Sequence, residues 1–279
     1  MKTMLVLSMG ALLLAGTLSA QTPVPEWQAG VDKVKTLIQS NPAQASEEAG
    51  ELLKGKNKKN VDLVTSVAHV YLDAGKITEA QEYLAMAKKA NNKDPKVSVL
   101  EGDIALAQKN IGQACQLYEQ AIYFDPNCKE AYLKYAQAYK SASPTQAIEK
   151  LEQLKAVDPN CLEADRELAE VYYSGNRFGK AAEMYAKFID TPLATEDDML
   201  KYAFALFLNH DFEKSLQVAQ KGLQKNARHA AFNRLVMYNN TDLKRYEDAE
   251  KAADAFFNAS DRADYSYLDY RYYGALLSA

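Results

Sequence analysis

The sequence predicts an all-α fold, an α-solenoid in which helical hairpins stack one after another. Two periodicities and the apolar pattern within each period predict it. Small residues recur every 33 or 34 residues, at Ala80, Ala114, Ala147, Ala181, Ser215 and Ala249. Prolines recur every 31 to 33 residues, at Pro95, Pro126, Pro159 and Pro192. A fixed period of about 20–50 residues is typical of repeat architectures, so we expect an array of small units.

Each unit has the apolar pattern of two short helices. In one unit, apolar side chains recur at helical spacing over Tyr132–Tyr139 and again over Ala147–Leu154. Between them, Ser143 and Pro144 have the order of an N-cap followed by the first helical residue. Asp-Pro dipeptides are expected to end the second helix, because proline lacks an N–H and clashes with the preceding turn. The unit is therefore predicted to be a helical hairpin, which needs neighbouring hairpins for stability.

These residues resemble the tetratricopeptide repeat, a helix–turn–helix unit of about 34 residues. The matching positions in this unit are Tyr132, Tyr135, Ala136, Tyr139, Ala147, Leu151, Leu154 and Pro159. Five further units match at part of the pattern. The resemblance implies a right-handed superhelix whose first helices line a concave groove, and in this family such grooves bind extended peptides or partner helices.

The period divides the chain into four kinds of segment. A signal peptide is expected over residues 1–20, and an N-terminal capping hairpin over 21–60. The first helix of an incomplete seventh repeat is expected over 263–279. Six repeats are expected between them, at about 61–94, 95–128, 129–161, 162–195, 196–228 and 229–262.

The first twenty residues have the pattern of a secretory signal peptide. Lys2 precedes the uncharged apolar run Met4–Ala15, and Leu18-Ser19-Ala20 places a small residue at the expected cleavage site. The run is shorter than the roughly 20 residues that span a bilayer, so no transmembrane anchor is expected, although an uncleaved anchor is the alternative. No cysteine follows the run to carry a lipid. The protein is expected to be exported, to the periplasm or the cell envelope.

No group of residues has the spacing that catalysis or metal binding requires. His69, His210 and His229 are far apart in sequence, so we interpret them as surface or turn residues and not as metal ligands. Gly55-Lys56 lacks the upstream glycine of a phosphate-binding loop. We therefore expect a protein that is not an enzyme and that holds no cofactor or metal.

Charge and cysteine content narrow the expectation further. A net charge of −4 gives no basic surplus for nucleic acid to bind, so no nucleic-acid partner is expected. Cys115, Cys128 and Cys161 are an odd number. The last two occupy equivalent positions of adjacent repeats, which packed helices separate by about 10 Å, beyond the Cα reach of about 7 Å for a disulfide. No disulfide is expected.

The resemblance places candidate binding residues on the first helices of three repeats. These candidates are Lys134, Gln137, Arg166, Glu170, Tyr173, Phe204 and Phe207. The equivalent positions of earlier repeats include Thr65, His69, Val99 and Asp103, and Leu133 and Leu200 lie beside the set. The asparagine that some members use to bind a C-terminal carboxylate is absent. Phe204 and Phe207 suggest an apolar hot spot, and the alternative is that they pack against the neighbouring repeat.

Two functions follow from these observations. The favoured one is a non-enzymatic protein–protein interaction scaffold of the bacterial cell envelope, which binds a peptide or partner protein in its groove. The alternative is the N-terminal part of a larger exported protein with a downstream enzymatic or glycan-binding activity. The apolar spacing of Tyr270–Leu277 predicts an inner helix without a successor. We therefore expect this C-terminal edge to be covered, either by a second copy in a homodimer or by residues of a longer parent chain.

Overall fold

The computed structural model describes residues 24–279 and shows fifteen α-helices and two short 3₁₀ helices, with no strand in that range. The expected all-α solenoid is confirmed. The expected signal peptide lies outside the described residues. The α-helices are α1 (Gln28–Ser40), α2 (Pro42–Leu52), α3 (Val61–Asp73), α4 (Ile77–Asn91), α5 (Pro95–Ala107), α6 (Ile111–Phe124), α7 (Lys129–Tyr139), α8 (Pro144–Val157), α9 (Leu162–Ser174), α10 (Phe178–Phe188), α11 (Glu196–Leu208), α12 (Phe212–Lys225), α13 (Ala230–Asp242), α14 (Tyr246–Ala259) and α15 (Tyr267–Leu277). The 3₁₀ helices are η1 (Gly55–Lys59) and η2 (Arg262–Asp264).

The helices pack as consecutive hairpins, α1 with α2, α3 with α4, and so on to α13 with α14. The first helices of neighbouring hairpins also contact one another, in the order α1, α3, α5, α7 and α9, and again from α11 through α13 to α15. In a curved stack the row of helices that packs more closely lies on the inside of the curve. The odd-numbered helices therefore form the concave face.

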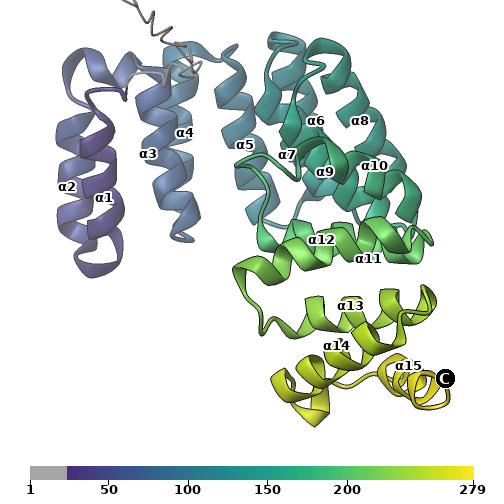
Figure 1. The fold of residues 1–279 in the computed structure, drawn as a ribbon. Coiled ribbons are helices and arrows are strands. Elements are labelled where there is room, and N and C mark those ends of the chain that lie inside the picture. The colour runs from purple at the N-terminus through teal and green to yellow at the C-terminus, as the bar shows by residue number, and fades with distance from the viewer. Residues whose placement is uncertain (1–23) are drawn as a thin grey trace, which may run out of the picture.

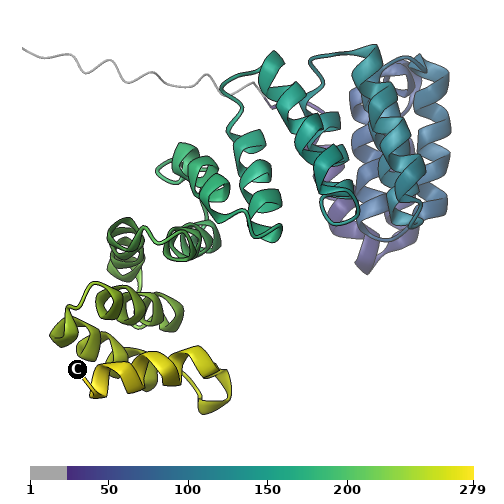
Figure 2. The same cartoon turned by 90° about the vertical axis from the view of Figure 1, so that its right-hand side faces the viewer.

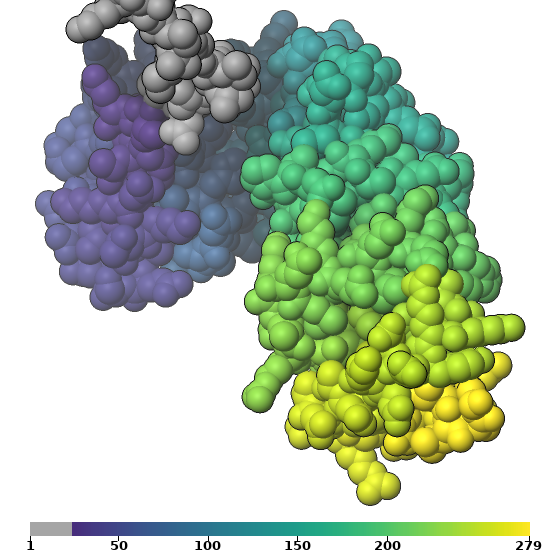
Figure 3. All heavy atoms as spheres, in the orientation of Figure 1, coloured from purple at the N-terminus to yellow at the C-terminus, as the bar shows by residue number. Residues whose placement is uncertain are grey.

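The curvature brings the two ends of the array to opposite sides of an open space. α1–α4 lie on one side of it and α11–α15 on the other (Figure 1). After a 90° turn, the C-terminal helices run across the direction of the N-terminal ones (Figure 2). With all atoms drawn, the two ends border a concavity (Figure 3).

The small residues of the repeat lie where the two helices of a hairpin cross. Ala80, Ala114, Ala147, Ala181 and Ala249 are fully buried. The second series of small positions is equally tight, because a Cβ added to Gly102 would lie 2.5 Å from the Tyr118 ring. Ser215 replaces the alanine in one repeat, where its hydroxyl donates to the Ala203 carbonyl at 2.8 Å and accepts from Asn239. Each close helix crossing requires a small residue, and one such crossing per repeat explains the 33- or 34-residue period of small residues.

Capping residues and prolines set several helix starts. Two of these signals, at Asp94-Pro95 and at Ser143, act differently from the expectation. Asp94 caps α5 by accepting from the Lys96 N–H, and Pro95 is the first residue of that helix. This Asp-Pro pair therefore opens a helix, whereas Pro126 follows the end of α6. Ser143 is the N-cap of α8, but its side chain makes no cap hydrogen bond.

The C-terminal helix α15 packs against α13 and α14. Leu276 belongs to the segment that was expected to lack a covering helix, but it is buried, with 9% of its surface exposed, in the same apolar cluster as residues of α13 and α14. Tyr267, Tyr270 and Leu277 are exposed, at 82%, 51% and 70%. The exposed apolar face of α15 therefore contains fewer residues than the sequence spacing predicts, because Leu276 is not part of it.

Candidate binding groove

All seven candidate residues lie on three first helices of the concave row. Lys134 and Gln137 are on α7, Arg166, Glu170 and Tyr173 are on α9, and Phe204 and Phe207 are on α11. The structure separates them into two groups. The polar candidates bridge neighbouring helices, and the aromatic ones line a pocket or the core beneath it.

An acidic residue of α5 is the centre of the first polar cluster. Asp103 lies between two neighbouring first helices, with the His69 Nε2 of α3 at 2.9 Å and the Lys134 Nζ of α7 at 3.0 Å. The Tyr118 hydroxyl donates to the other carboxylate oxygen at 2.7 Å. One carboxylate therefore joins three consecutive hairpins, and Lys134 is engaged within the fold.

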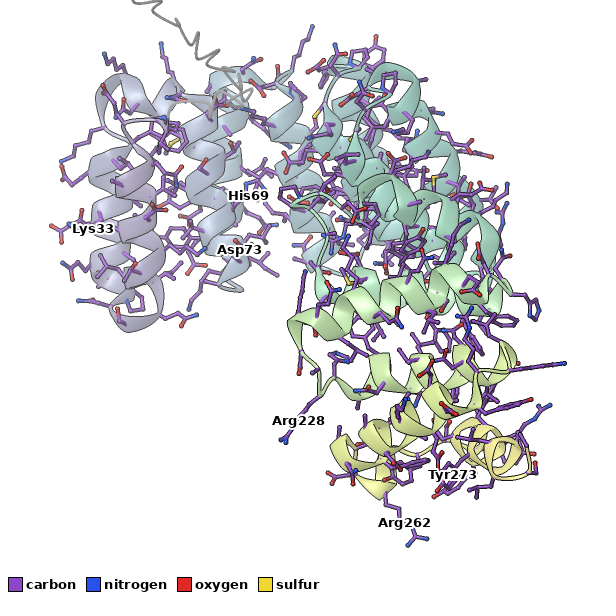
Figure 4. The ribbon with its side chains drawn as sticks, viewed as in Figure 1. Lys33, His69, Asp73, Arg228, Arg262 and Tyr273 are labelled. Atoms are coloured by element: carbon purple, nitrogen blue, oxygen red, sulfur yellow. The ribbon has the colours of Figure 1, made fainter. Side chains whose placement is uncertain are left out.

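His69 is not the ordinary surface histidine that the sequence suggested. Its Nδ1 lies 2.9 Å from the Thr65 carbonyl oxygen, and its Nε2 faces the carboxylate of Asp103. Two acceptors require two N–H donors, which only the protonated imidazole has. Figure 4 shows His69 on the side of α3 that is turned toward α5.

The pKa values of both groups reflect this contact. Burial acts to lower the pKa of His69, but the hydrogen bond and the charge of Asp103 outweigh it and raise the pKa above its ordinary 6.5. Burial likewise opposes ionisation of Asp103, but its bonds to His69 and Lys134 lower its pKa below the ordinary 3.8. The charged form of each partner stabilises the charged form of the other.

The same arrangement recurs two repeats later. Glu170 of α9 accepts from the Tyr185 hydroxyl at 2.7 Å, and the Lys201 ammonium of α11 lies 3.0 Å away. The spacing from acid to tyrosine is 15 residues and that from acid to lysine is 31 residues in both clusters. Glu170 therefore bridges neighbouring first helices within the fold.

The remaining polar candidates also reach the next repeat. Arg166 of α9 contacts the buried Asp198 of α11, at 3.0 Å from its Nη2. Gln137 of α7 donates to Glu167 of α9 at 2.7 Å. The sequence contained a signal for these pairs, namely complementary polar residues about 30–34 positions apart, which the groove assignment did not use.

The two phenylalanines separate into different environments. Phe207 is buried, with 6% of its surface exposed, and its ring contacts Phe212, Tyr238 and Tyr272. It packs the neighbouring repeats, as the alternative interpretation held. Phe204 is only half-buried, with its ring centre 6.1 Å from that of Phe207. Phe204 is thus the exposed edge of an aromatic core.

Phe204 lines a pocket of about 290 Å³ between α9, α11 and α13. Tyr173, Leu200 and Leu235 supply further apolar surface, and the complete lining is Tyr173, Asp197, Leu200, Lys201, Phe204, Ala231, Arg234 and Leu235. Arg234 is held at the edge by Asp269 of α15 at 2.9 Å and by the Asp264 carbonyl. The sequence candidates did not include Arg234 and Leu235, because the first helix of their repeat departs from the regular pattern.

A second hollow, of about 310 Å³, lies at the N-terminal end of the same face. Thr65, His69 and Val99, all equivalent to groove positions, line it together with Pro25 and Trp27 from before α1. Polar and charged side chains complete it, namely Asp62, Ser66, Lys96 and Glu130. The N-terminal hollow is therefore polar where the pocket around Phe204 is largely apolar.

The comparisons with known proteins agree with this geometry. The sequence profile of the tetratricopeptide repeat matches residues 68–127 and 137–193. The chain therefore contains tetratricopeptide repeats over these residues. No protein with a curated description matches it by sequence.

Solved structures of other tetratricopeptide-repeat and pilus proteins have the same fold. The C-terminal part of a repeat protein from Cytophaga hutchinsonii superimposes with a TM-score of 0.63 at 16% identity, covering 88% of this chain and 99% of that one. PilF of Pseudomonas aeruginosa gives 0.60 at 16% identity, covering 80% and 99%. PilW, described as a widely conserved type IV pilus biogenesis factor, gives 0.56 at 17%, covering 72% and 94%. At such identities the likeness concerns the fold alone.

In this repeat-containing chain, the described residues contain no group of three or more His, Cys, Asp or Glu side chains placed to hold a metal ion. Cys115, Cys128 and Cys161 are free thiols. Burial raises the pKa of Cys115 to about 11, so this thiol is protonated and unreactive at neutral pH. Within residues 24–279 no helix has the length and apolar character to cross a membrane.

Proposed function

We propose that the protein is a non-enzymatic protein–protein interaction scaffold of the bacterial cell envelope, and that its concave face binds a peptide or a segment of a partner protein through the pocket around Phe204. The observation that carries the proposal is the contrast within this face. The charged candidates form contacts between helices, while Tyr173 and Phe204 present apolar surface to an open pocket.

The chemistry of the pocket indicates what its ligand presents. A volume of about 290 Å³ accommodates one or two side chains, and its apolar wall favours a large aliphatic or aromatic one. Asp197 and Lys201, which pair with each other at 2.8 Å, lie at the edge of the same pocket. Their polar groups can orient a peptide backbone, and because the two charges balance, the bound peptide needs no net charge of its own. An apolar anchor residue in an otherwise polar segment fits this surface.

A displayed peptide library provides the test, because the partner is unknown. Selected peptides should share a large apolar residue, and Phe204→Ala should weaken their binding about tenfold or more, as measured by fluorescence polarisation. Tyr123→Ala is the matched control, because Tyr123 is 83% exposed on α6 and lies outside the pocket. Equal loss in the two variants, or peptides without an apolar consensus, would contradict the proposal.

Location in the envelope is supported by the signal-peptide pattern of residues 1–20. PilW, one of the structures with this fold, is described as a pilus biogenesis factor, but an identity of 17% does not transfer that role. Export of a reporter fused after Ala20 would test the location directly. Retention of the reporter inside the cell would contradict it.

The outer face of α15 supports the proposed homodimer. Tyr270 and Leu277 are exposed there, and Tyr273 packs on Phe257 with ring centres 5.0 Å apart. We expect Tyr270→Glu with Leu277→Glu to shift a dimer to monomer in light scattering without lowering the melting temperature, since Leu276 beneath them is untouched. A wild-type protein that is monomeric at high concentration would contradict the proposed dimer.

A further inference from the structure

The outer side of the N-terminal hairpins carries a basic hollow that the groove does not use. It has a volume of about 370 Å³ and is lined by Lys58, Lys59, Glu82, Ala85, Met86, Lys89 and Ala90. All but the first two belong to α4, a second helix, and the first two belong to η1. The hollow is therefore outside the concave row, on the opposite side from the proposed peptide site.

The fold itself creates this hollow. α2 ends at Leu52, and η1 follows it before α3 begins at Val61. η1 contacts both α3 and α4. Asn57 anchors η1 by donating to the Leu52 carbonyl at 2.9 Å, and Asn60 caps α3 directly after it. The lysine run is thus held in a fixed turn and is not a loose loop.

The lysines of this surface are unpaired. Lys56, Lys58, Lys59 and Lys89 are exposed, and within residues 24–279 none of them has a carboxylate oxygen within 4.0 Å. Glu82 is the single acid in the lining of the hollow. The chain has a net charge of −4, but these lysines make the surface around the hollow locally positive.

The floor of the hollow is apolar. Ala85, Met86 and Ala90 form it, and no aromatic side chain lines it. Single-stranded nucleic acid needs aromatic surfaces for base stacking, which this hollow lacks. A phospholipid presents a phosphate next to apolar chains, which matches lysine ammonium groups around methyl and thioether groups.

We propose that this surface, defined by Lys58, Lys59 and Lys89 around the Ala85–Met86–Ala90 floor, docks the protein reversibly on a membrane rich in anionic phospholipid. Each lysine near an anionic surface strengthens binding about fivefold, and the effect is lost at high salt. Docking through the outer side of α4 leaves the concave face open to its partner.

Vesicle flotation of the full chain tests the proposal. Vesicles of phosphatidylcholine alone are compared with vesicles containing about 30% phosphatidylglycerol, an anionic fraction at which a surface potential develops. Binding to neutral vesicles measures the contributions that do not depend on lipid charge, from the apolar residues 4–15 and from the apolar floor of the hollow. We expect additional binding to the anionic vesicles at low salt, and its loss at about 0.5 M salt.

The variant K58Q/K59Q/K89Q should reduce the additional binding about 100-fold, the product of three fivefold effects. The matched control is K76Q/K140Q/K225Q, which removes the same charge from three exposed lysines outside the hollow and should leave more than half of the binding. Thermal melts of both variants should coincide with wild type, since none of these side chains is buried. Equal loss in the two triple variants, no preference for anionic vesicles, or stronger binding to single-stranded RNA or to an acidic peptide would overturn the proposal.

Discussion

The concave row is joined differently at its two ends. From α3 to α7 the first helices are connected by a carboxylate, Asp103, with a histidine and a lysine on either side. From α11 to α15 they are connected by stacked rings, with Tyr238 and Tyr272 only 4.2 Å apart and Phe207 beside both. We call the contacts of Asp103 the polar joint and the contacts of Phe207, Tyr238 and Tyr272 the aromatic joint. The same repeat geometry thus accommodates either kind of contact between first helices, and the apolar pocket lies beside the aromatic joint.

Phe207→Ala should show the largest effect, because it removes a buried ring from the aromatic joint. Truncation of a buried phenylalanine costs about 3–5 kcal/mol, and Phe207 is 6% exposed among four other rings. Urea denaturation would measure the change. Phe204→Ala, at the half-buried edge of the same cluster, should cost less than about half as much. Equal costs would contradict the separation of core and pocket.

Asp103→Ala should have the next largest effect, because it leaves three partners without their acceptor. Loss of a mostly buried, charged hydrogen-bond centre costs about 2–3 kcal/mol, with the Asp103 side chain 10% exposed. Asp73, which is exposed at the end of the neighbouring α3, is the control, and Asp73→Ala should stay within about 0.5 kcal/mol of wild type. Similar destabilisation by both variants would mean that the cluster is not a structural joint.

The fold could be predicted from sequence because its determinants are local and repeated. A small residue is needed at each helix crossing, as the contact of Gly102 with Tyr118 shows, and that need recurs at a fixed spacing. The roles of the groove residues depend on neighbouring repeats instead. Phe207 is covered by Tyr272 of α15, and a helix periodicity alone cannot show which face a later helix will cover.

The contacts of the polar residues between repeats were not predicted for a related reason. The groove positions were taken from a pattern within one repeat, whereas Lys134 and Glu170 contact residues one repeat away. His69 was interpreted as a surface residue because its partner Asp103 is 34 positions distant. Comparison of charges between successive repeats would have found the contacts of both Asp103 and Glu170.

His69 gives the smallest expected effect, and it separates the polar joint from the aromatic one by pH. The pKa of His69 is raised above 6.5 in the folded protein. A raised pKa contributes stability that is fully present below the unfolded value of about 6.5 and is lost as the pH rises through the folded value. His69→Gln should therefore lose stability relative to wild type at about pH 6, by less than about 1 kcal/mol for a partly exposed pair, and differ less at about pH 9.

Melting temperatures of wild type and His69→Gln at about pH 6, 7.5 and 9, on both sides of the ordinary histidine pKa, would measure this difference. His210 and His229 are present in both proteins, so any contribution from them cancels in the comparison. Asp103 remains ionised throughout, because its pKa lies below 3.8, and Lys134 and Glu130 complete the charges that act on His69. In an Asp103→Asn background the effect of His69→Gln should lose this pH dependence or reverse its sign, since the charge that raises the pKa of His69 is gone while burial and the Lys134 ammonium still lower it. A difference that stays constant over this pH range in the wild-type background would show that the imidazole is neutral in the joint, and that only the lysine bridges the carboxylate.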